Sequence, residues 1–329
     1  KNYLNEIIQN EIHNYTQNQG IEELRNLISD CYYDNFSPDE ICITVGAEEA
    51  IFTVLNSFLN QGDLLLIPDP IFPAYKTIAE FAGAKVVTFA LDCTKNFAVN
   101  RKQLESVIGK MKIKALLLCN PSNPTSHSLS TEDQEYIVKI CREKKILLIV
   151  DEIYLSLSFF PIRSFSELGK DIVIISGLSK SFSLTGWRIG WFAAPSEVIN
   201  KLTRLHQFTV TCAPYISQRL AIKLLQSKKL VDDYFLKNNL NRNQKHSIEF
   251  LSGELKYQIP TPDAAPYLFV EIPFDDLNFV QRCKSNGVLV VPGSVFGEMG
   301  KNHIRINYGV DFKLLEQGLK RIGEVINSN

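Results

Sequence analysis

A lysine and an arginine eight residues apart are the side chains of this sequence that most clearly suggest chemistry. Lys180 follows the apolar run 172–175, and Arg188 precedes a second apolar run at 189–194. We expect both runs to be buried strands. Desolvation at the end of a buried strand lowers the pKa of a lysine, and a partly neutral amine condenses with an aldehyde. The forked guanidinium of Arg188 suits a phosphate group.

Such a pair suits a cofactor with both an aldehyde and a phosphate, which describes pyridoxal 5'-phosphate (PLP). Residues 176–191 resemble a stretch of the class I and II aminotransferases, whose pattern is S-x-S-K…G-W-R-x-G. The resemblance implies that Lys180 forms the Schiff base with PLP and that Arg188 binds its phosphate. Many relatives have a phosphate-binding serine where this chain has Gly177, and we expect Ser179 to substitute for it. The alternative for this motif alone is a surface lysine and a structural arginine.

Two upstream turns resemble further parts of the same cofactor site. The first breaks a strand at Gly46 before a helix, and the free N–H groups at the start of a helix suit a phosphate. The resemblance implies that Ala47 and Glu48 bind the phosphate through their backbone; an ordinary capped helix is the alternative. The second turn, residues 68–75, resembles P-x-[YFW]-P-x-Y and implies that Phe72 stacks on the pyridine ring. A plain core aromatic is the alternative.

The next two predicted strands each end in a polar cluster. Strand 115–119 leads into a rigid turn with two Asn-Pro steps, at the strand end where open α/β sheets bind ligands. The resemblance implies that Asn123 contacts the phenolic oxygen of PLP and the substrate. Strand 146–150 ends in Asp-Glu-Ile-Tyr, and a carboxylate there needs a cationic partner. The resemblance pairs Asp151 with the pyridinium nitrogen and Tyr154 with the phenolic oxygen; a helix cap is the alternative for Asp151.

Two candidate residues lie outside these strand ends. Arg305 sits in an alternating, strand-like segment that follows a P-G-x-x-F-G pattern at 292–297. The resemblance implies that it binds the substrate α-carboxylate, which a guanidinium can grip with two hydrogen bonds; a surface arginine is the alternative. Tyr15 begins a Y-x-x-x-x-G-x-x-x-L-R segment, which implies that it crosses a dimer interface to the phosphate of the neighbouring subunit. An interface or surface tyrosine is the alternative. The turn 261–267 also resembles the family.

Composition excludes several other classes of function. The chain has 329 residues, 45% hydrophobic content and a net charge of −1, which allows a large core and gives no nucleic-acid footprint. No apolar run is long enough to span a membrane. The five histidines lack metal-ligand spacing, so we expect no metal site. The seven cysteines are an odd number without C-x-x-C spacing, which predicts buried free thiols in a reducing cytoplasm.

The order of the predicted elements indicates the fold class. Apolar strands alternate with helices, and a helical region at 196–250 precedes short strands and a final helix at 312–326. We expect an α/β fold with a mostly parallel central sheet sandwiched by helices. The large PLP-binding domain would be 1–225, with 1–25 a partial N-terminal segment, and a smaller α+β domain would be 226–329. The resemblance implies fold type I of the PLP-dependent transferases.

The resemblance covers nearly the whole chain and implies an aminotransferase. The enzyme would move an amino group between an L-amino acid and a 2-oxo acid by a ping-pong mechanism, as a cytoplasmic homodimer. The subgroup with aromatic and N-acetyl-diaminopimelate aminotransferases is most similar. Two alternatives stay open: a PLP-dependent lyase on the same fold, and a non-catalytic effector domain of a transcription regulator. Family members have some tens of residues before the Tyr15 motif, so we expect a trimmed, disordered or shortened N-terminus.

Overall fold

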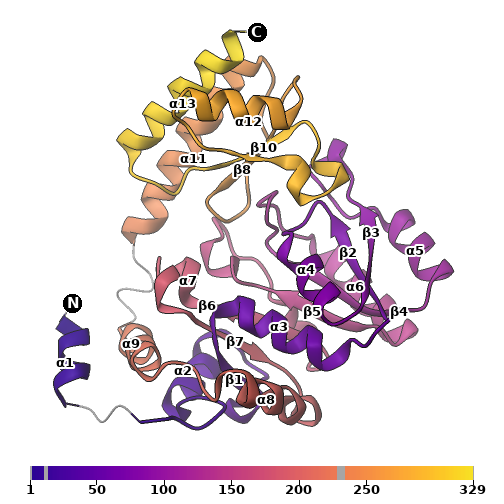
Figure 1. Ribbon diagram of the computed structural model, residues 1–329, viewed down its shortest axis with the longest axis vertical. Helices are drawn as coiled ribbons and strands as arrows, with labels where there is room; N and C mark the ends of the chain where they lie inside the picture. Colours follow the sequence, from indigo (N-terminus) through magenta and orange to yellow (C-terminus); the bar gives the residue numbers. More distant parts are fainter. Residues whose placement is uncertain (1, 11–13, 228–233, 329) are drawn as a thin grey trace.

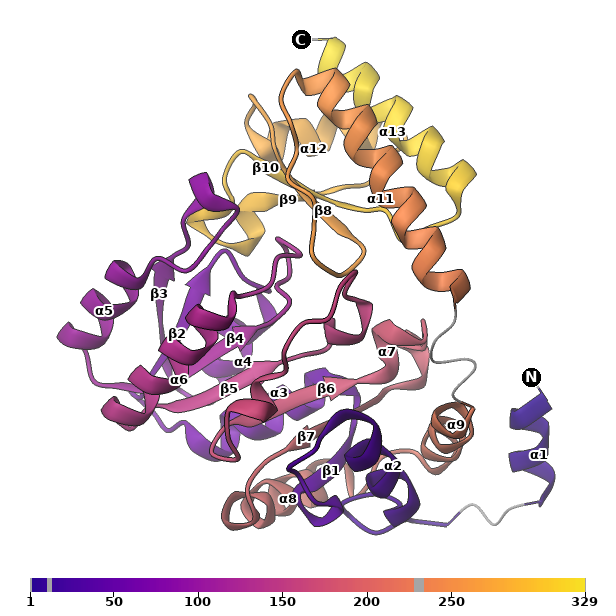
Figure 2. The same ribbon diagram turned by 180° about the vertical axis from the view of Figure 1, so that it is seen from behind.

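The computed structural model describes residues 2–10, 14–227 and 234–328, and it contains two sheets stacked along the long axis (Figures 1 and 2). The larger sheet has the order β1-β7-β6-β5-β4-β2-β3. β7 is antiparallel to both neighbours, and the pairs from β6 through to β3 are parallel. This confirms the mostly parallel central sheet. Its strands are β1 (Ile41–Val45), β2 (Leu64–Asp69), β3 (Lys85–Ala90), β4 (Ile113–Cys119), β5 (Leu147–Asp151), β6 (Val173–Gly177) and β7 (Ile189–Ala193).

Helices cover both faces of the larger sheet, as the doubly apolar strands predicted. Alternate strand residues face opposite layers, so that Leu117 of β4 packs in one hydrophobic cluster and Leu116 in the other. One face is covered by α3 (Gly46–Phe58), α4 (Ala74–Phe81) and α8 (Ser196–Val210). The other is covered by α2 (Glu22–Tyr32), α5 (Arg101–Lys110), α6 (Thr131–Lys144) and α9 (Tyr215–Gln226). Asp151 lies on the same face of the sheet as Leu117. Leu117 pairs with Ile149 of β5, and Asp151 is two residues further along that strand, so both side chains point toward α3 and α4.

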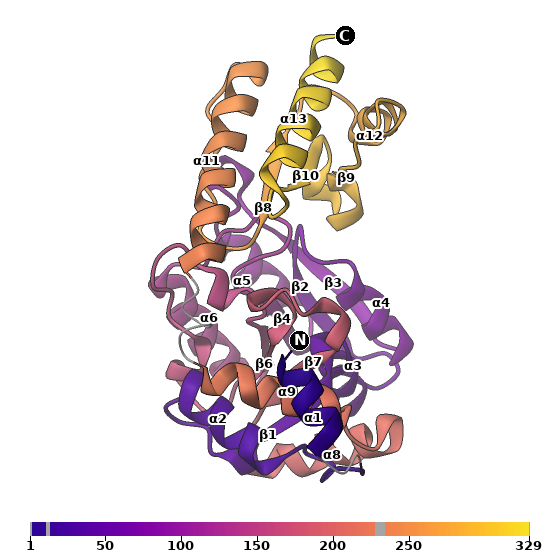
Figure 3. The ribbon, with the colours of Figure 1, turned by 90° about the vertical axis from the view of Figure 1, so that its left-hand side faces the viewer.

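The smaller sheet lies beyond the carboxyl ends of the parallel strands (Figure 1). It is antiparallel, in the order β8-β10-β9. Its strands are β8 (Tyr267–Glu271), β9 (Val291–Pro292) and β10 (His303–Asn307), and its helices are α11 (Tyr234–Leu255), α12 (Asp276–Ser285) and α13 (Phe312–Asn327). Figure 3 shows α11 and α13 side by side. The final helix was predicted from the sequence, whereas α12 was not. Asp275 caps the start of α12, and Phe279 and Cys283 lie on its buried face.

The remaining elements are short. The apolar residues at 3, 4, 7, 8 and 12 have helical spacing, which predicts a helix over 3–14. Helix α1 (Asn2–Asn10) forms the first part of it and packs on α9, and residues 11–13 lie outside the described residues. The helical region predicted at 196–250 contains α8, α9 and most of α11, with a break between Val210 and Tyr215. The boundary between 225 and 226 stays a prediction. The other helical turns are α7 (Leu178–Ser181), η1 (Pro38–Glu40), η2 (Cys93–Lys95), η3 (Leu155–Leu157), η4 (Phe165–Leu168), η5 (Thr185–Trp187), η6 (Gly293–Phe296) and η7 (Glu298–Gly300).

The described helices differ from membrane-spanning helices in length or in apolar character. Within residues 2–10, 14–227 and 234–328, none combines the length and the apolar character that a membrane-crossing helix requires.

Candidate active site

A pocket of about 250 Å³ opens where the larger sheet meets the smaller one. Every site residue predicted from the sequence lines this pocket except Tyr15. The side chains come from strand ends and helix starts that are far apart in the chain. The lining residues are Ala47, Glu48, Ile51, Phe72, Tyr75, Asn123, Asp151, Ile153, Tyr154, Ser179, Lys180, Thr185, Arg188, Tyr267 and Arg305.

Lys180 lies on the short helix α7 and not at the end of the strand itself. β6 ends at Gly177, and the chain turns into the helix there, so the lysine is half-buried where the sequence predicted a fully buried strand end. A Cβ at Gly177 would lie 2.8 Å from the carbonyl oxygen of Ile189, so the contact with β7 leaves no room for a serine. Ser179 is 7% exposed, and its hydroxyl has no hydrogen-bond partner among the described residues.

The start of α3 and the Arg188 side chain form a positively charged end of the pocket. The N–H groups of Ala47 and Glu48 belong to the first turn of α3, where no helical carbonyl can accept from them. Arg188 donates through Nη2 to the carbonyl oxygen of Val45, 3.4 Å away. Gly46 has φ +78°, and a Cβ there would lie 2.5 Å from Arg188 Nη2. Glycine is therefore needed for the guanidinium to lie against the helix start.

A buried carboxylate stands on the face of the sheet toward α3 and α4. Asp151 is 4% exposed and accepts hydrogen bonds from the Tyr75 hydroxyl at 2.8 Å and from the Ile153 N–H at 3.0 Å. Burial raises the pKa of Asp151 to about 6, while these two donors and the charge of Lys180 act to lower it. A cation at the open side of this carboxylate would favour its ionised form. Asp151 is not the cap of the helical turn that follows, because the residue at the cap position of η3 is Tyr154. The Asp151 carboxylate instead closes a local turn by accepting from the Ile153 N–H.

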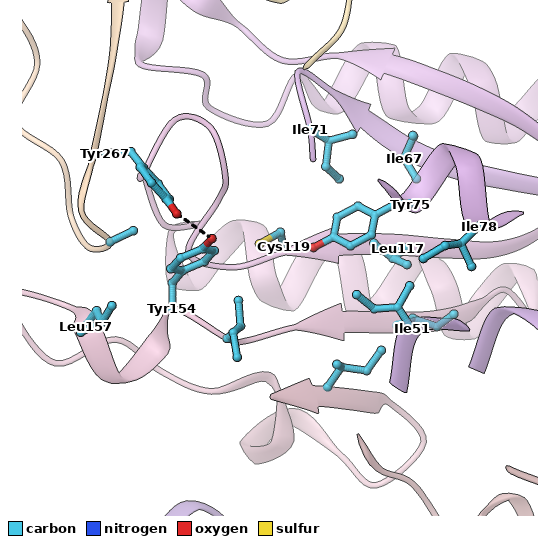
Figure 4. Close-up of a cluster of buried hydrophobic side chains, with 14 of the residues drawn as sticks. Ile51, Ile67, Ile71, Tyr75, Ile78, Leu117, Cys119, Tyr154, Leu157 and Tyr267 are labelled. Carbon is cyan, nitrogen blue, oxygen red and sulfur yellow. Dashed lines mark hydrogen bonds between the residues drawn. The ribbon is translucent and has the colours of Figure 1, made fainter. Parts of the chain in front are cut away.

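Asn123, Tyr154 and Tyr267 form a polar row beside the carboxylate. The Asn123 amide donates to the Tyr154 hydroxyl at 3.5 Å, and the Tyr154 and Tyr267 hydroxyls lie 3.3 Å apart (Figure 4). Burial and the neighbouring Tyr267 raise the pKa of Tyr154 well above its ordinary value. The Tyr154 phenol therefore stays protonated near neutral pH and can donate to an oxygen in the pocket.

Arg305 enters the pocket from β10 of the smaller sheet. Its Nη1 donates to Asn123 Oδ1 at 2.8 Å. The guanidinium carbon lies 4.4 Å from the centre of the Tyr267 ring and 4.9 Å from that of Phe296. Both rings favour the cation and restrict its rotation. A guanidinium has five N–H donors, so the bond to Asn123 leaves others for an anion.

Tyr15 and Phe72 were both predicted as cofactor contacts, and the structure separates them. Phe72 lines the pocket and meets Tyr75 edge-to-face, with 5.6 Å between the ring centres. Tyr15 is 85% exposed and lies outside the pocket, beside a surface hollow that also involves Val45, Val210 and Pro214. Nothing in a single chain tests a contact with a second subunit, so that role stays a prediction.

Five pocket residues were not selected from the sequence: Ile51, Tyr75, Ile153, Thr185 and Tyr267. Two of them are tyrosines that end patterns recognised in the sequence. Tyr75 is the last residue of the pattern that marked Phe72, and Tyr267 ends the turn 261–267. Both patterns were recognised, but a tyrosine in a motif does not say which side chain its hydroxyl will meet. That information comes from the tertiary structure, which brings Tyr75 of α4 to Asp151 of β5 and Tyr267 of β8 to Tyr154.

Comparison with known proteins assigns the chain to a family. The model of the family "Aminotransferase class I and II" matches residues 3–322. The aspartate aminotransferase of Thermotoga maritima is 30% identical over 324 residues, which covers 95% of this chain and 84% of the relative. The "Probable N-acetyl-LL-diaminopimelate aminotransferase" of Bacillus subtilis is 31% identical over 332 residues, with 96% and 82% covered. The crystal structure of an aromatic aminotransferase from Pyrococcus horikoshii matches with a TM-score of 0.92 and 29% identity, over 99% of this chain and 91% of that one.

The chain belongs to the class I and II aminotransferases and has the fold type I architecture. It is an enzyme that uses PLP and transfers an amino group between an amino acid and a 2-oxo acid by the ping-pong mechanism of the family. The pocket fits the cofactor on its own evidence. The hydroxyl of Ser179, which has no hydrogen-bond partner in the described part of the chain, and the start of α3 suit a phosphate, and the buried Asp151 suits a cationic ring nitrogen.

Proposed function

We propose that the pocket between the two sheets is the transamination site, with PLP bound covalently to Lys180. The phosphate would be held by the N–H groups of Ala47 and Glu48, by Arg188 and by the hydroxyl of Ser179. The observation that carries this proposal is the division of charge, with an anion-binding end at α3 and a buried carboxylate at the end of β5. This division matches a group with a phosphate and a cationic ring at opposite ends.

The ring would lie between Phe72 and the end of β5. Asp151 would keep the ring nitrogen protonated, while Asn123 and Tyr154 would donate to the phenolic oxygen. When bound, the protonated ring acts as an electron sink for charge that develops on the substrate α-carbon. Asp151 is suited to this role because a buried carboxylate is stabilised mainly by a cation next to it.

Lys180 would also be the acid and base of the reaction. After the amino acid has taken its place on the cofactor, the free amine of Lys180 would accept the α-proton and return it at C4' of the cofactor. Arg305 would bind the substrate α-carboxylate with two parallel hydrogen bonds. The half-buried position of Arg305, beside two aromatic rings, supports this role, because restricted motion of the guanidinium would hold the substrate carboxylate in one orientation.

We also propose a homodimer that completes the site. Tyr15 is 85% exposed beside the surface hollow, and Phe208 of α8 is 76% exposed. A second copy covering these aromatic side chains would remove them from water. Tyr15 would then reach the phosphate of the neighbouring subunit. Sedimentation of wild-type protein and of Phe208→Asp would test this proposal, since a monomeric wild type contradicts it.

We place the enzyme in the cytoplasm. The seven cysteines all lie within the described residues and form no disulfide, and Cys42, Cys119, Cys141 and Cys283 are buried. Thiols in this state are typical of a reducing compartment.

The absorbance spectrum of the purified protein tests the proposed site. An amino donor such as glutamate, aspartate or an aromatic amino acid should convert the band of the lysine-bound cofactor into that of the pyridoxamine form, and a 2-oxo acid should reverse it. Lys180→Ala should abolish the first band. Release of ammonia with formation of a 2-oxo acid, without the pyridoxamine form, would instead support the lyase alternative.

A further inference from the structure

Tyr75 is a buried tyrosine whose hydroxyl meets the carboxylate at the floor of the pocket. Its side chain is 1% exposed, and its hydroxyl donates to Asp151 Oδ2 at 2.8 Å. The other oxygen, Oδ1, accepts from the Ile153 N–H at 3.0 Å. Each oxygen of the carboxylate therefore has one donor from the protein and one further lone pair for a partner in the pocket.

The position of the Tyr75 ring is determined by packing on several sides. The ring meets Phe72 edge-to-face at 81°, and the Tyr75 N–H donates to the Phe72 carbonyl oxygen. Figure 4 shows the ring among Ile67, Ile78 and Leu117, with its hydroxyl directed toward Cys119. The Cys119 thiol donates to the carbonyl oxygen of Pro121 at 3.2 Å. A ring held in this way keeps its hydroxyl at one place.

We propose that Tyr75 is a positioning residue for transamination, whose hydroxyl orients the Asp151 carboxylate and favours its ionised form toward the ring nitrogen of PLP. This inference rests on the proposed placement of the cofactor in the pocket. A carboxylate with one donor on each oxygen cannot rotate freely, so its remaining lone pairs point in a defined direction. Tyr75 thus acts on the reaction through Asp151 and touches no reacting atom.

Electrostatics gives the hydroxyl a second effect. Burial raises the pKa of Asp151, whereas the hydrogen bond from Tyr75 stabilises the ionised form and lowers it. The reciprocal effect is seen on the tyrosine, since burial and the charge of Asp151 raise the pKa of Tyr75 well above its ordinary value. The phenol therefore stays a donor across the working pH range. Without this donor, more of the carboxyl would be protonated near neutral pH and could not accept from the ring nitrogen.

Tyr75→Phe is the direct test, because it removes one oxygen and keeps the packed ring. In the cofactor-free protein, carbon-13 NMR of the aspartate carboxyl groups should show the Asp151 titration midpoint rising by about 1 pH unit or more. In the loaded enzyme, kcat should fall about tenfold to a hundredfold, the size of one hydrogen bond to a charged group. KM for the amino acid should change little. Tyr308→Phe is the matched control, because Tyr308 is a buried tyrosine outside the pocket that donates to the carbonyl oxygen of Ala265.

A cofactor analogue with carbon in place of the ring nitrogen separates positioning from packing. With this analogue, wild type and Tyr75→Phe should react at the same rate, because the route through Asp151 is missing. An unchanged NMR midpoint, or a kcat within about twofold of wild type, overturns the role of Tyr75. Asp151→Asn distinguishes that result from failure of the proposed site: full activity of Asp151→Asn would overturn the placement of the cofactor itself.

Discussion

The two halves of the pocket are built in different ways. The cofactor half lies at the carboxyl ends of parallel strands of the larger sheet, and its polar side chains Asn123, Asp151 and Ser179 are each less than a tenth exposed. The substrate half is Arg305 with its two aromatic neighbours, on a small antiparallel sheet that meets the larger one at its edge. Changes in the first half should therefore alter chemistry and cofactor binding, whereas changes in the second should alter substrate binding alone.

The two halves meet through several contacts. Asp69 at the end of β2 accepts hydrogen bonds from the Glu298 and Met299 N–H groups, at 3.0 and 3.1 Å. Arg305 donates to Asn123, and Phe97 of the larger unit packs on Phe269 and His303 of the smaller one. Hydrogen bonds from Ser128 to Asp263 and between the Tyr154 and Tyr267 hydroxyls add to them. Single substitutions can nevertheless separate the roles of the two halves.

The largest effect should follow loss of the amine in the cofactor half. Lys180→Ala should reduce kcat by about 10²–10⁴-fold or more, since it removes both the covalent link and the proton carrier. PLP should still bind, through the phosphate end, without the lysine-bound absorbance band. Lys139→Ala is the control, because Lys139 is an exposed lysine on α6. Activity within tenfold of wild type would contradict the role of Lys180.

Removing the guanidinium of the substrate half should be the next largest change. Arg305→Ala should lower kcat/KM by an amount that corresponds to a loss of about 2–5 kcal/mol of transition-state stabilisation, because the substrate carboxylate would lose its paired charge. The kcat/KM of Arg305→Lys should lie between those of wild type and Arg305→Ala, since an ammonium cannot form the forked pair. The spectrum of bound PLP should stay as in wild type. A change in cofactor affinity similar to the change in kcat/KM would show that the two halves are not separable.

The buried carboxylate of the cofactor half should cost stability when no cofactor is bound. Burial raises the pKa of Asp151 to about 6, so the folded chain keeps a proton that the unfolded chain loses near pH 4. The contribution of Asp151 to stability should therefore fall as pH rises between about 4 and 6, by at most about 3 kcal/mol, and stay level above that range. Asp151→Asn cannot ionise, so the cofactor-free variant should be more stable than wild type at pH 8 and not at pH 4.

Denaturant unfolding of the cofactor-free protein at both pH values measures this difference. The same variant should be a poor enzyme, as expected where function requires a buried charge. Glu152→Gln is the control, because Glu152 is buried next to Asp151 and does not line the pocket. It should leave the affinity for PLP unchanged. Equal stabilities of wild type and Asp151→Asn at pH 8 would argue against the raised pKa.

The smallest effect should come from weakening the link between the halves. Asp69→Asn leaves one acceptor where the carboxylate has two, at a cost of about 1.5 kcal/mol or more. The turn that carries Phe296 would loosen against the larger unit, and KM for the amino acid should rise up to about tenfold with the affinity for PLP unchanged. Asp275→Asn should be neutral, because asparagine caps α12 equally well. An equal rise in KM for both variants would contradict a role specific to Asp69.

Much of the cofactor half could be predicted from local sequence. Strongly apolar runs predict buried parallel strands, and polar residues directly after them predict a site at their carboxyl ends. Lys180 was predicted at the end of the buried strand but lies on the short helix α7 that follows it, because Gly177 gives no local sign that β6 ends there in a close contact with β7. Helix α12 was missed, since the segment has ten residues and only two of its four apolar residues, Phe279 and Cys283, are buried.

The chain by itself determined the residue types at each strand end, their order and the family to which they belong. Only the tertiary structure decided which of these side chains meet. The bond between Arg305 and Asn123 joins residues 182 positions apart, and the one between Tyr75 and Asp151 joins residues 76 apart. Neither distance follows from helix or strand preference, because each depends on how whole elements pack against one another.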